Sequence, residues 1–240
     1  MEKREFILEF SHKAQLFPIE VGESQIEQFY TYMELLLQWN EKMNLTAITQ
    51  PKEVILKHFM DSLTILPYLN GAEQILDIGT GAGFPGIPLK IVEKEKKFTL
   101  LDSLNKRVIF LNEVIQKLGL EKIQAIHGRA EEVAQKPENR EKYDVVVSRA
   151  VAKLNSLVEY MLPFLTIGGK CICMKSSDIE EEIKEAKNAI HILGGEIEKV
   201  DEIVLPESDI KRKIIVIKKI NPTPKKFPRK PGMATKEPII

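Results

Sequence analysis

The sequence predicts an α/β fold, a mostly parallel seven-stranded sheet with helices on both faces and a helical N-terminal segment. After Gly71, short apolar runs alternate with stretches of helical periodicity, the pattern of strand–helix–strand units in a parallel sheet. The last two apolar runs follow each other without a helix, which predicts an antiparallel closing hairpin. We therefore divide the chain into a helical N-terminal segment (1–70), an α/β domain (71–220) and a C-terminal tail (221–240).

The N-terminal segment contains two apolar series with helical spacing. Ser24 and Glu27 form a capping-box pattern, which predicts that a helix starts there. The second series ends near Pro67, and no strand pattern precedes Asn70. The two series consist of Ile26, Phe29, Tyr30, Met33, Leu36 and Leu37, and of Val54, Ile55, Phe59, Leu63 and Leu66.

The α/β domain carries seven short apolar runs that we predict to be strands. One helical pattern between them, with Val108 and Leu111 on its apolar face, ends at Gly119. Another opens with the capping pattern Asp178-x-x-Glu181 and stops at Gly194-Gly195. The predicted strands are residues 74–78, 98–101, 123–126, 144–147, 170–174, 202–205 and 214–217.

Composition excludes several classes of protein. No apolar run approaches the roughly 18 residues that span a bilayer, and the charged first residues do not form a signal peptide. The two cysteines, Cys171 and Cys173, lie in one apolar run, where they cannot easily bridge and are too few for a zinc site. We expect buried, reduced cysteines, no metal, no membrane and a cytoplasmic location.

Charge is unevenly distributed, although the formal net charge of the chain is zero. Residues 211–240 hold ten Lys or Arg and one acid, a net charge of +9, which leaves −9 on residues 1–210. From Asn221 the chain is basic and proline-rich without periodicity, which predicts an extended tail. A basic tail on an acidic body indicates a polyanionic partner.

The strongest chemical signal follows the first predicted strand. Residues 76–88 read LDIGTGAGFPGIP, a strand that runs into a glycine-rich turn and then a helix. Gly79, Gly81 and Gly83 let the backbone approach a ligand at the carboxyl end of the strand, where doubly wound sheets bind cofactors. Such a turn can bind S-adenosylmethionine or a dinucleotide. Gly81-x-Gly83-x-x-Gly86 also matches the dinucleotide fingerprint, so a nicotinamide or flavin dinucleotide is the alternative cofactor to S-adenosylmethionine.

Two features of this turn favour S-adenosylmethionine. Asp77 would repel a diphosphate but attract the ammonium group of the methionine moiety. Pro85 and Pro88 reduce the N–H groups that the helix start could offer to phosphate. Asp102, at the end of the next strand, could accept ribose hydroxyls in either cofactor class and does not discriminate between them.

Further motifs follow in order along the chain, and together they resemble one family. They are WNEKMNLT (39–46), HFMDSL (58–63), the glycine loop, DSLNKRVIFL (102–111), GRAE (128–131), VSRA (147–150) and TPKKFPRKPG (223–232). The family is the glucose-inhibited division protein B family of bacterial 16S ribosomal RNA guanine-N7 methyltransferases. The resemblance covers nearly the whole chain and departs at Lys175, which is followed by Ser176 instead of glycine.

The resemblance implies a Rossmann-like class I methyltransferase that uses S-adenosylmethionine. It implies as acceptor N7 of a guanine in the 530 loop of 16S rRNA, nucleotide 527 in the usual count, so the partner is this rRNA or the small ribosomal subunit. Gly79 and Phe84 would line the methionine end of the cofactor, and Asp102 with Ser103 would lie at the ribose. Ala130 and Glu131 would border the adenine, and Arg149 would lie where cofactor and substrate meet.

Guanine N7 carries a lone pair and no proton, so its methylation needs alignment but no general base. Arg149 could donate to guanine O6 while N7 faces the methyl group, and its alternative role is a structural ion pair at a strand end. For the RNA we expect a contact from Asn44 at the rim of the active site, with loop capping as its alternative role. The other expected RNA contacts are Lys175, Lys225, Lys226, Arg229 and Lys230.

Other interpretations remain open. An NAD-dependent oxidoreductase would need a hydride-transfer acid or base, such as Tyr-x-x-x-Lys, that we do not find. A non-catalytic RNA- or ribosome-binding module would not need the intact glycine loop and Asp102. His58 and Asp61, one helical turn apart, are interpreted as a surface pair, and Trp39 as a core residue.

Overall fold

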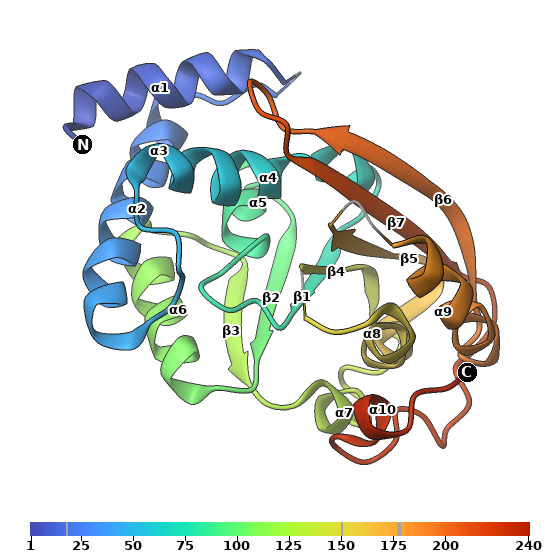
Figure 1. The fold of residues 1–240 in the computed structure, drawn as a ribbon. Helices are drawn as coiled ribbons and strands as arrows, with labels where there is room; N and C mark the ends of the chain where they lie inside the picture. Colours follow the sequence, from blue (N-terminus) through green and yellow to red (C-terminus); the bar gives the residue numbers. More distant parts are fainter. Residues whose placement is uncertain (18, 150, 177–178) are drawn as a thin grey trace.

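The computed structural model describes residues 1–17, 19–149, 151–176 and 179–240, and these residues contain one seven-stranded sheet (Figure 1). The strand order is β3-β2-β1-β4-β5-β7-β6. Strands β1 to β5 pair in parallel, and β7 pairs antiparallel with both β5 and β6. The predicted fold class and closing hairpin are confirmed. The strands are β1 (Gln74–Ile78), β2 (Lys97–Asp102), β3 (Ile123–His127), β4 (Tyr143–Arg149), β5 (Leu165–Lys175), β6 (Gly195–Val204) and β7 (Lys211–Lys219).

Each of the seven predicted strands overlaps an observed one, but the predicted bounds of β6 are wrong. The prediction covered residues 202–205, whereas β6 begins at Gly195. Most of its side chains are at least partly exposed, because β6 is an edge strand. An exposed edge strand does not need an apolar run, so its first residues carry no signal of that kind.

The helices lie on both faces of the sheet (Figure 1). On one face α7, α8 and α9 pack against alternate strand residues such as Leu76, Val146 and Cys171. On the other face lie α5, α6 and the N-terminal helices. The helical segments of both faces, in chain order, are α1 (Lys3–Gln15), α2 (Glu23–Met43), α3 (Pro51–Val54), η1 (Ile55–Met60), α4 (Asp61–Leu63), η2 (Leu66–Leu69), α5 (Gly86–Val92), α6 (Asn105–Lys117), α7 (Ala130–Val133), α8 (Leu154–Met161), η3 (Leu162–Phe164), α9 (Glu180–Ile192) and α10 (Met233–Lys236).

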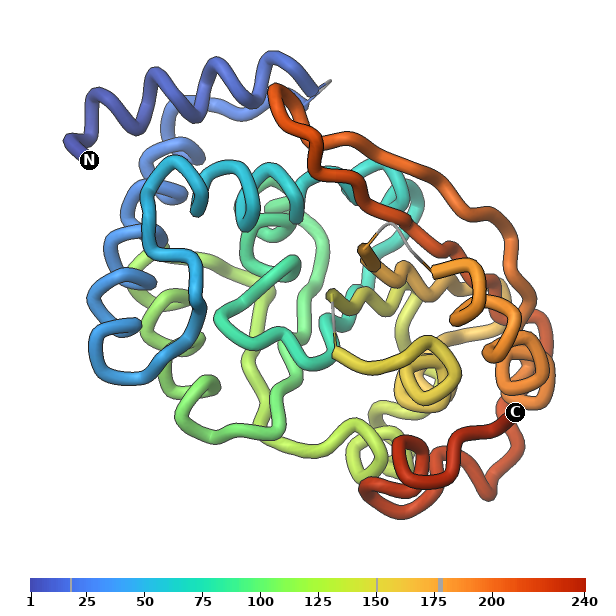
Figure 2. The backbone as a smooth tube through the Cα atoms, in the orientation of Figure 1, coloured from blue at the N-terminus to red at the C-terminus, as the bar shows by residue number. Residues whose placement is uncertain are grey.

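The N-terminal helices share a core with the sheet domain. Phe29 and Phe59 belong to the same buried cluster as Phe84, Leu100 and Phe110. Trp39 packs against this cluster, its ring 5.5 Å from that of Phe110, as expected of a core residue. Figure 2 shows α1 running beside the tip of the β6–β7 hairpin, where His12 and Lys13 contact Glu207. The N-terminal segment therefore contacts both the core cluster around α5 and α6 and the β6–β7 hairpin at one edge of the sheet.

Of two local expectations for the N-terminal segment, the capping box needs correction and the second helical series is confirmed. Helix α2 starts at Glu23, and the side chain of Gln25, rather than Glu27, accepts a hydrogen bond from the N–H of Gly22. The second apolar series forms a continuous helical stretch whose middle, Ile55–Met60, is a π-helix. Such π-helical turns occur often at functional sites, and this one contains His58.

The C-terminal tail is not the extended tail that its composition predicts. Phe227 and Ala234 are buried in the core cluster that contains α8 and α9. The Arg140 guanidinium donates to the carbonyls of Phe227 and Thr223 at 2.8 Å each. Proline keeps the segment from forming a long helix, while side chains of the body bind its free carbonyls.

Two expectations fall on residues outside the described part. Asp178, expected to cap α9, and Ala150, in the VSRA motif, belong to this group. Among the described residues, no helix is both long and apolar enough to cross a bilayer. Cys171 and Cys173 are buried as expected, and burial raises the pKa of Cys173 to about 12.

Candidate functional site

The glycine loop after β1 has the backbone geometry that only glycine adopts freely. Gly79, Gly81 and Gly83 have φ values of 66°, 62° and 101°. A Cβ on Gly83 would lie 2.5 Å from the Ile87 side chain and 2.7 Å from the Tyr32 hydroxyl. The loop is thus held close to helix α5 on one side and to the N-terminal helix α2 on the other.

The Asp77 side chain binds the loop through hydrogen bonds and does not line a pocket. Its buried carboxylate accepts hydrogen bonds from the Thr80 hydroxyl at 2.7 Å and from the Gly86 N–H at 2.8 Å. Burial raises the pKa of Asp77 to about 6, and its Oδ1 has no partner among the described residues. The expected direct contact with the methionine ammonium is corrected to a loop contact, because the Asp77 side chain is fully buried.

The same contact bears on the choice of cofactor. Gly86 is the first residue of α5, so its N–H is one of those that a dinucleotide fold turns toward phosphate. Here that N–H is bound by the Asp77 carboxylate. Pro85 stands just before it and has no N–H to donate. The start of α5 is therefore poorly suited to bind a diphosphate.

Asp102, at the end of β2, lies across the loop from Asp77. Its Oδ2 accepts from the Gly81 N–H at 2.9 Å and from the Arg107 guanidinium at 3.2 Å. Its Oδ1 accepts from the Leu104 N–H at 2.9 Å. These bonds fix the carboxylate beside the loop. Both acceptor sites of Oδ2 are used, whereas Oδ1 keeps one site for a hydroxyl group.

Two adjoining pockets open at the carboxyl ends of the parallel strands. The larger one, about 430 Å³, lies over the loop and reaches Arg149, and the smaller one, about 230 Å³, lies toward α7 and α8. Gly79, Ser103 and Val151 border both pockets. The larger pocket is also lined by Leu45, Thr46, His58, Thr80, Gly81, Ala82, Phe84, Asp102 and Arg107, and the smaller one by Ile78, Leu101, Gly128, Arg129, Ala130, Glu131, Ala152, Tyr160 and Thr235.

Arg149, the last residue of β4, is held by a buried ion-pair cluster. Its guanidinium donates to Asp61 Oδ2 at 3.0 Å, and Arg212 of β7 donates to Asp61 Oδ1 at 2.9 Å. Asp61 is only 1% exposed, so its charge depends on both arginines. The carbon atom of the Arg149 guanidinium lies 5.0 Å from the centre of the Phe84 ring, at cation–π distance.

His58 completes the wall beside Arg149. Its ring stacks on Phe84 with centroids 4.3 Å apart, and Arg149 donates to its Nδ1 at 3.3 Å. Since Nδ1 accepts, the ring proton is on Nε2, which lies 2.8 Å from the Thr46 hydroxyl. Burial, and next the Arg149 charge, lower the pKa of His58 to about 3, so the ring is neutral at pH 7. The interpretation of His58 and Asp61 as a surface pair is wrong, because both are buried and bound to Arg149.

The smaller pocket brings together residues from α7, α8 and the tail. Ala130 and Glu131 begin α7, and the Glu131 carboxylate accepts from the Gly232 N–H at 3.0 Å. The Tyr160 hydroxyl lies 2.9 Å from the Thr235 hydroxyl. This half of the site is thus built partly from the C-terminal tail.

The residues expected to contact RNA fall into two groups. Asn44, Lys225, Lys226 and Lys230 are exposed, and Asn44 also ends α2 with a φ of 48°. Lys175, by contrast, is buried and bound to Glu182 and to the Ala152 carbonyl. Arg229 forms a multiple hydrogen-bonded ion pair with the buried Glu159 at distances down to 2.6 Å. Lys175 therefore serves an internal ion pair, in correction of its expected RNA contact. Arg229 pairs internally as well, but its side chain is 26% exposed, so its RNA contact stays a prediction.

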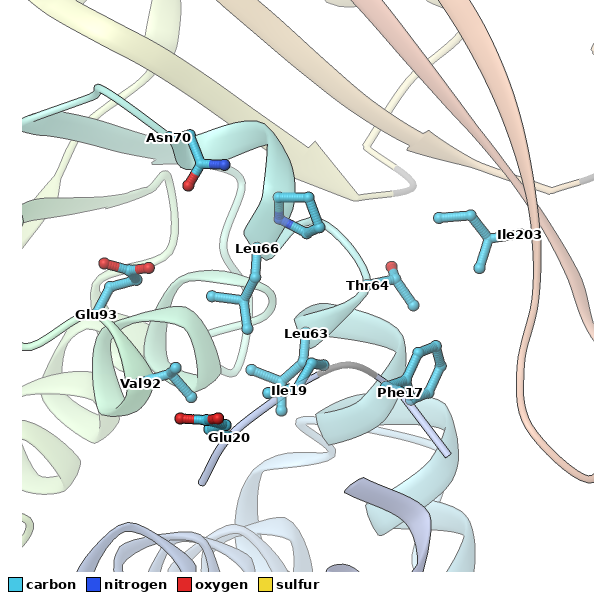
Figure 3. Close-up of a pocket in the computed structure, with 11 residues that line it drawn as sticks. Phe17, Ile19, Glu20, Leu63, Thr64, Leu66, Asn70, Val92, Glu93 and Ile203 are labelled. Atoms are coloured by element: carbon cyan, nitrogen blue, oxygen red, sulfur yellow. The ribbon is translucent and has the colours of Figure 1, made fainter. Parts of the chain in front are cut away.

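A further pocket, about 410 Å³, lies away from the glycine loop (Figure 3). Phe17 and Ile19, which follow α1, face Leu66 of η2 and Val92 of α5 across it. Glu93, at its rim, precedes β2, so the pocket lies toward the amino ends of the strands. Open α/β sheets bind their ligands at the opposite, carboxyl ends.

Sequence reasoning missed Arg212, Thr46, Tyr160 and Thr235 as residues around the site. They come from four distant segments, and none of them lies at the carboxyl end of a parallel strand or in the glycine loop. The usable signals were the motif WNEKMNLT, which ends at Thr46, and the motif HFMDSL, which placed His58 and Asp61 in the pattern of the family. Contacts between distant segments leave no local pattern in a single sequence.

Solved structures with the same fold include a methyltransferase and a protein solved in complex with AdoMet. An O-methyltransferase from Bacillus cereus in complex with SAH aligns with a TM-score of 0.57 at 18% identity, over 90% of this chain and 100% of that one. TYW2 from M. jannaschii in complex with AdoMet aligns with a TM-score of 0.53 at 17% identity, over 67% of this chain and 77% of that one. At these identities the likeness shows the Rossmann-like fold.

Sequence comparison gives the family. A protein named ribosomal RNA small subunit methyltransferase G from Alkaliphilus metalliredigens is 55% identical over 221 residues, which are 91% of this chain and 92% of that protein. A protein of the same name from Clostridium novyi is 49% identical over 95% of this chain and 94% of its own length. The model of the GidB family, described as rRNA small subunit methyltransferase G, matches residues 25–214. The chain therefore belongs to the GidB family of small-subunit rRNA methyltransferases.

Proposed function

We propose that this protein transfers a methyl group from S-adenosylmethionine to N7 of a guanine in the 530 loop of 16S rRNA, nucleotide 527 in the usual count. Family membership supports methylation of small-subunit rRNA. Two structures with the same fold contain SAH or AdoMet as the bound ligand, which supports the choice of cofactor. The guanine atom and the nucleotide rest on the chemistry of the site and on the resemblance described above.

The two adjoining pockets fit the elongated shape of S-adenosylmethionine. The methionine end would lie in the larger pocket, over the backbone of Gly79 and beside Phe84. The ribose would lie between the pockets at Asp102 and Ser103, and the adenine in the smaller pocket at Glu131. When bound, the cofactor supplies an electrophilic methyl group on its sulfonium sulfur. The chain supplies the shape, the acceptors and the exclusion of water around it.

The observation that carries the choice of N7 is that the imidazole in the reaction pocket is not free to act as a base. Arg149 donates to Nδ1 of His58, and the Nε2 proton is directed to Thr46. A pKa of about 3 also leaves this ring a very weak base. An exocyclic amine loses a proton when it is methylated, and a base must accept that proton. Guanine N7 attacks with a lone pair and carries no proton. The site fits the less demanding reaction.

Arg149 is the residue we propose to orient the guanine. The contacts formed within the described part of the chain use three of its five N–H groups. The remaining two can donate to guanine O6, on the same edge of the base as N7. Asp61 and Phe84 hold the guanidinium in place, so the guanine would meet a donor that is already oriented.

The exposed basic side chains of the tail are proposed to bind RNA phosphates. Lys225, Lys226 and Lys230 are exposed on the surface of the tail, and Asn44 is exposed at the rim of the N-terminal helices. The partner would be 16S rRNA or the small ribosomal subunit, which places the reaction in the cytoplasm. Deleting residues 221–240 is a poor test of this idea, because Thr223, Phe227 and Ala234 are buried in the fold.

The proposed activity is tested with methyl-labelled S-adenosylmethionine and rRNA that lacks modifications. The RNA is presented naked, as 30S subunits and as 70S ribosomes, and the products are digested and analysed as nucleosides. We expect 7-methylguanosine as the labelled product, with Arg149→Ala as the inactive control. A label in any other nucleoside would contradict the proposal.

A further inference from the structure

The C-terminal tail contributes to the lining of the smaller pocket. Thr235 lines the pocket together with Tyr160 and Glu131, and the Gly232 N–H donates to the Glu131 carboxylate. In Figure 1 this part of the tail, with α10, lies next to α7 and α8. A segment near the end of the chain thus forms a wall of the pocket that the glycine loop opens.

The position of this wall is fixed by buried contacts on both sides. The Ser156 hydroxyl of α8 donates to the Ala234 carbonyl at 2.7 Å, and both residues are buried. Upstream, the backbone N–H and the guanidinium of Arg229 bind the Glu159 carboxylate, which is also buried. A carboxylate buried at this depth needs its partner, so the docked state of the tail is strongly favoured.

The pair of hydroxyls on this wall has unused hydrogen-bonding capacity. Two hydroxyls offer two donors and four acceptor sites, and the bond between Tyr160 and Thr235 uses one of each. Burial raises the pKa of Tyr160, so its phenol keeps its proton at neutral pH. Thr235 is exposed, so its side chain is accessible from the pocket that it lines. Adenine presents donors and acceptors along one edge, which such a pair can bind.

We propose that the Thr235 and Tyr160 hydroxyls bind the adenine of the cofactor and that the docked tail is part of the cofactor site. This rests on the proposed placement of the cofactor with its adenine in the smaller pocket. The basic tail would then have two roles on two sides: its exposed lysines face outward to RNA, and residues 232–235 face inward to the cofactor.

The test measures binding of S-adenosylhomocysteine by calorimetry, without RNA, to the full chain and to Thr235→Val and Tyr160→Phe. Each variant removes one hydroxyl at nearly constant shape, and we expect affinity to fall about fivefold, as for one neutral hydrogen bond. The exposed neighbour variant Lys236→Ala is the matched control and should bind as the wild type does. Methylthioadenosine, which lacks the amino-acid end, should show the same ratios, because the lost contact is at the adenine.

A shortened chain that ends at Lys230 should bind S-adenosylhomocysteine at least tenfold more weakly, provided that its thermal unfolding remains cooperative. If the shortened chain does not fold, the two single variants decide. Wild-type affinity in both Thr235→Val and Tyr160→Phe would overturn the proposal. Since no RNA is used, that result would leave methylation of guanine N7 intact, whereas a wild-type protein that bound no S-adenosylhomocysteine would overturn the proposed function as well.

Discussion

Replacing Arg149 tests the proposed mechanism at its centre. Arg149 is the last residue of β4 and lines the larger pocket. Its guanidinium donates to Asp61 and lies over the ring of Phe84. Arg149→Ala removes the donor that we propose for guanine O6 and leaves the glycine loop intact. Arg149→Lys keeps the positive charge but loses the planar fork that contacts Asp61 and His58 together.

The expected magnitude follows from the contacts that are lost. A hydrogen bond from a charged donor contributes about 1.5–3 kcal/mol, and a guanine that is no longer aligned costs more. A total of about 3–4 kcal/mol corresponds to a loss of roughly 10²–10³ in kcat/KM for Arg149→Ala. Folding should lose less than the 3–5 kcal/mol typical of a broken buried pair, about 2–3 kcal/mol, because Asp61 keeps Arg212 at 2.9 Å.

The assay combines two measurements on the same preparations. Methyl transfer to small subunits gives kcat/KM, and calorimetry gives the affinity for S-adenosylhomocysteine. We expect kcat/KM to fall by at least a hundredfold in Arg149→Ala and about tenfold or more in Arg149→Lys, with cofactor affinity within about threefold of the wild type. An Arg149→Ala protein that kept a third or more of the wild-type kcat/KM would refute the proposed role of Arg149.

Two other predictions concern buried charge and RNA binding. Burial raises the pKa of Asp77 from 3.8 to about 6, so the folded state binds this proton more tightly than the unfolded state; the resulting stability is complete below pH 3.8 and is lost as the pH rises through 6. The free energy of unfolding of Asp77→Asn, measured with denaturant, should therefore rise by up to about 3 kcal/mol relative to that of the wild type between pH 4 and pH 7. A difference between the two free energies that does not change with pH would contradict this. Combined Lys225→Ala, Lys226→Ala and Lys230→Ala should reduce the slope of log affinity for RNA against log salt by up to about 2, whereas Lys3→Ala on α1 should leave it unchanged; equal slopes for both proteins would exclude the tail as a phosphate-binding surface.

The fold could be predicted because its signals are local. Strand–helix alternation, the turn glycines and the missing helix before the last strand each lie within a few residues of the chain. Gly79 and Asp102 were found in the same way, since a strand end followed by glycines indicates a cofactor site in such sheets, whereas Phe84 was found only through the family resemblance. The first residues of the edge strand β6 were not predicted, because an exposed strand needs no apolar pattern.

The contacts that complete the site could not be predicted, because they join distant segments. Asp61, between two arginines from β4 and β7, gives no sign of its burial in the sequence. The tail was interpreted as extended because proline and lysine dominate it, yet Phe227 and Ala234 are buried against the body and Arg229 pairs with Glu159. Composition reports the average character of a segment, whereas a few buried residues decide where the segment lies.

The central claim is that the pocket beside Arg149 presents guanine N7, and no other atom, to the methyl group. The most direct measurement compares two reconstituted small subunits that differ in one atom, with guanine or 7-deazaguanine at the target nucleotide. The account predicts full methylation of the first and none of the second, while both bind the protein equally well. Equal methylation of the two subunits would contradict it, because the acceptor would then be an atom other than N7.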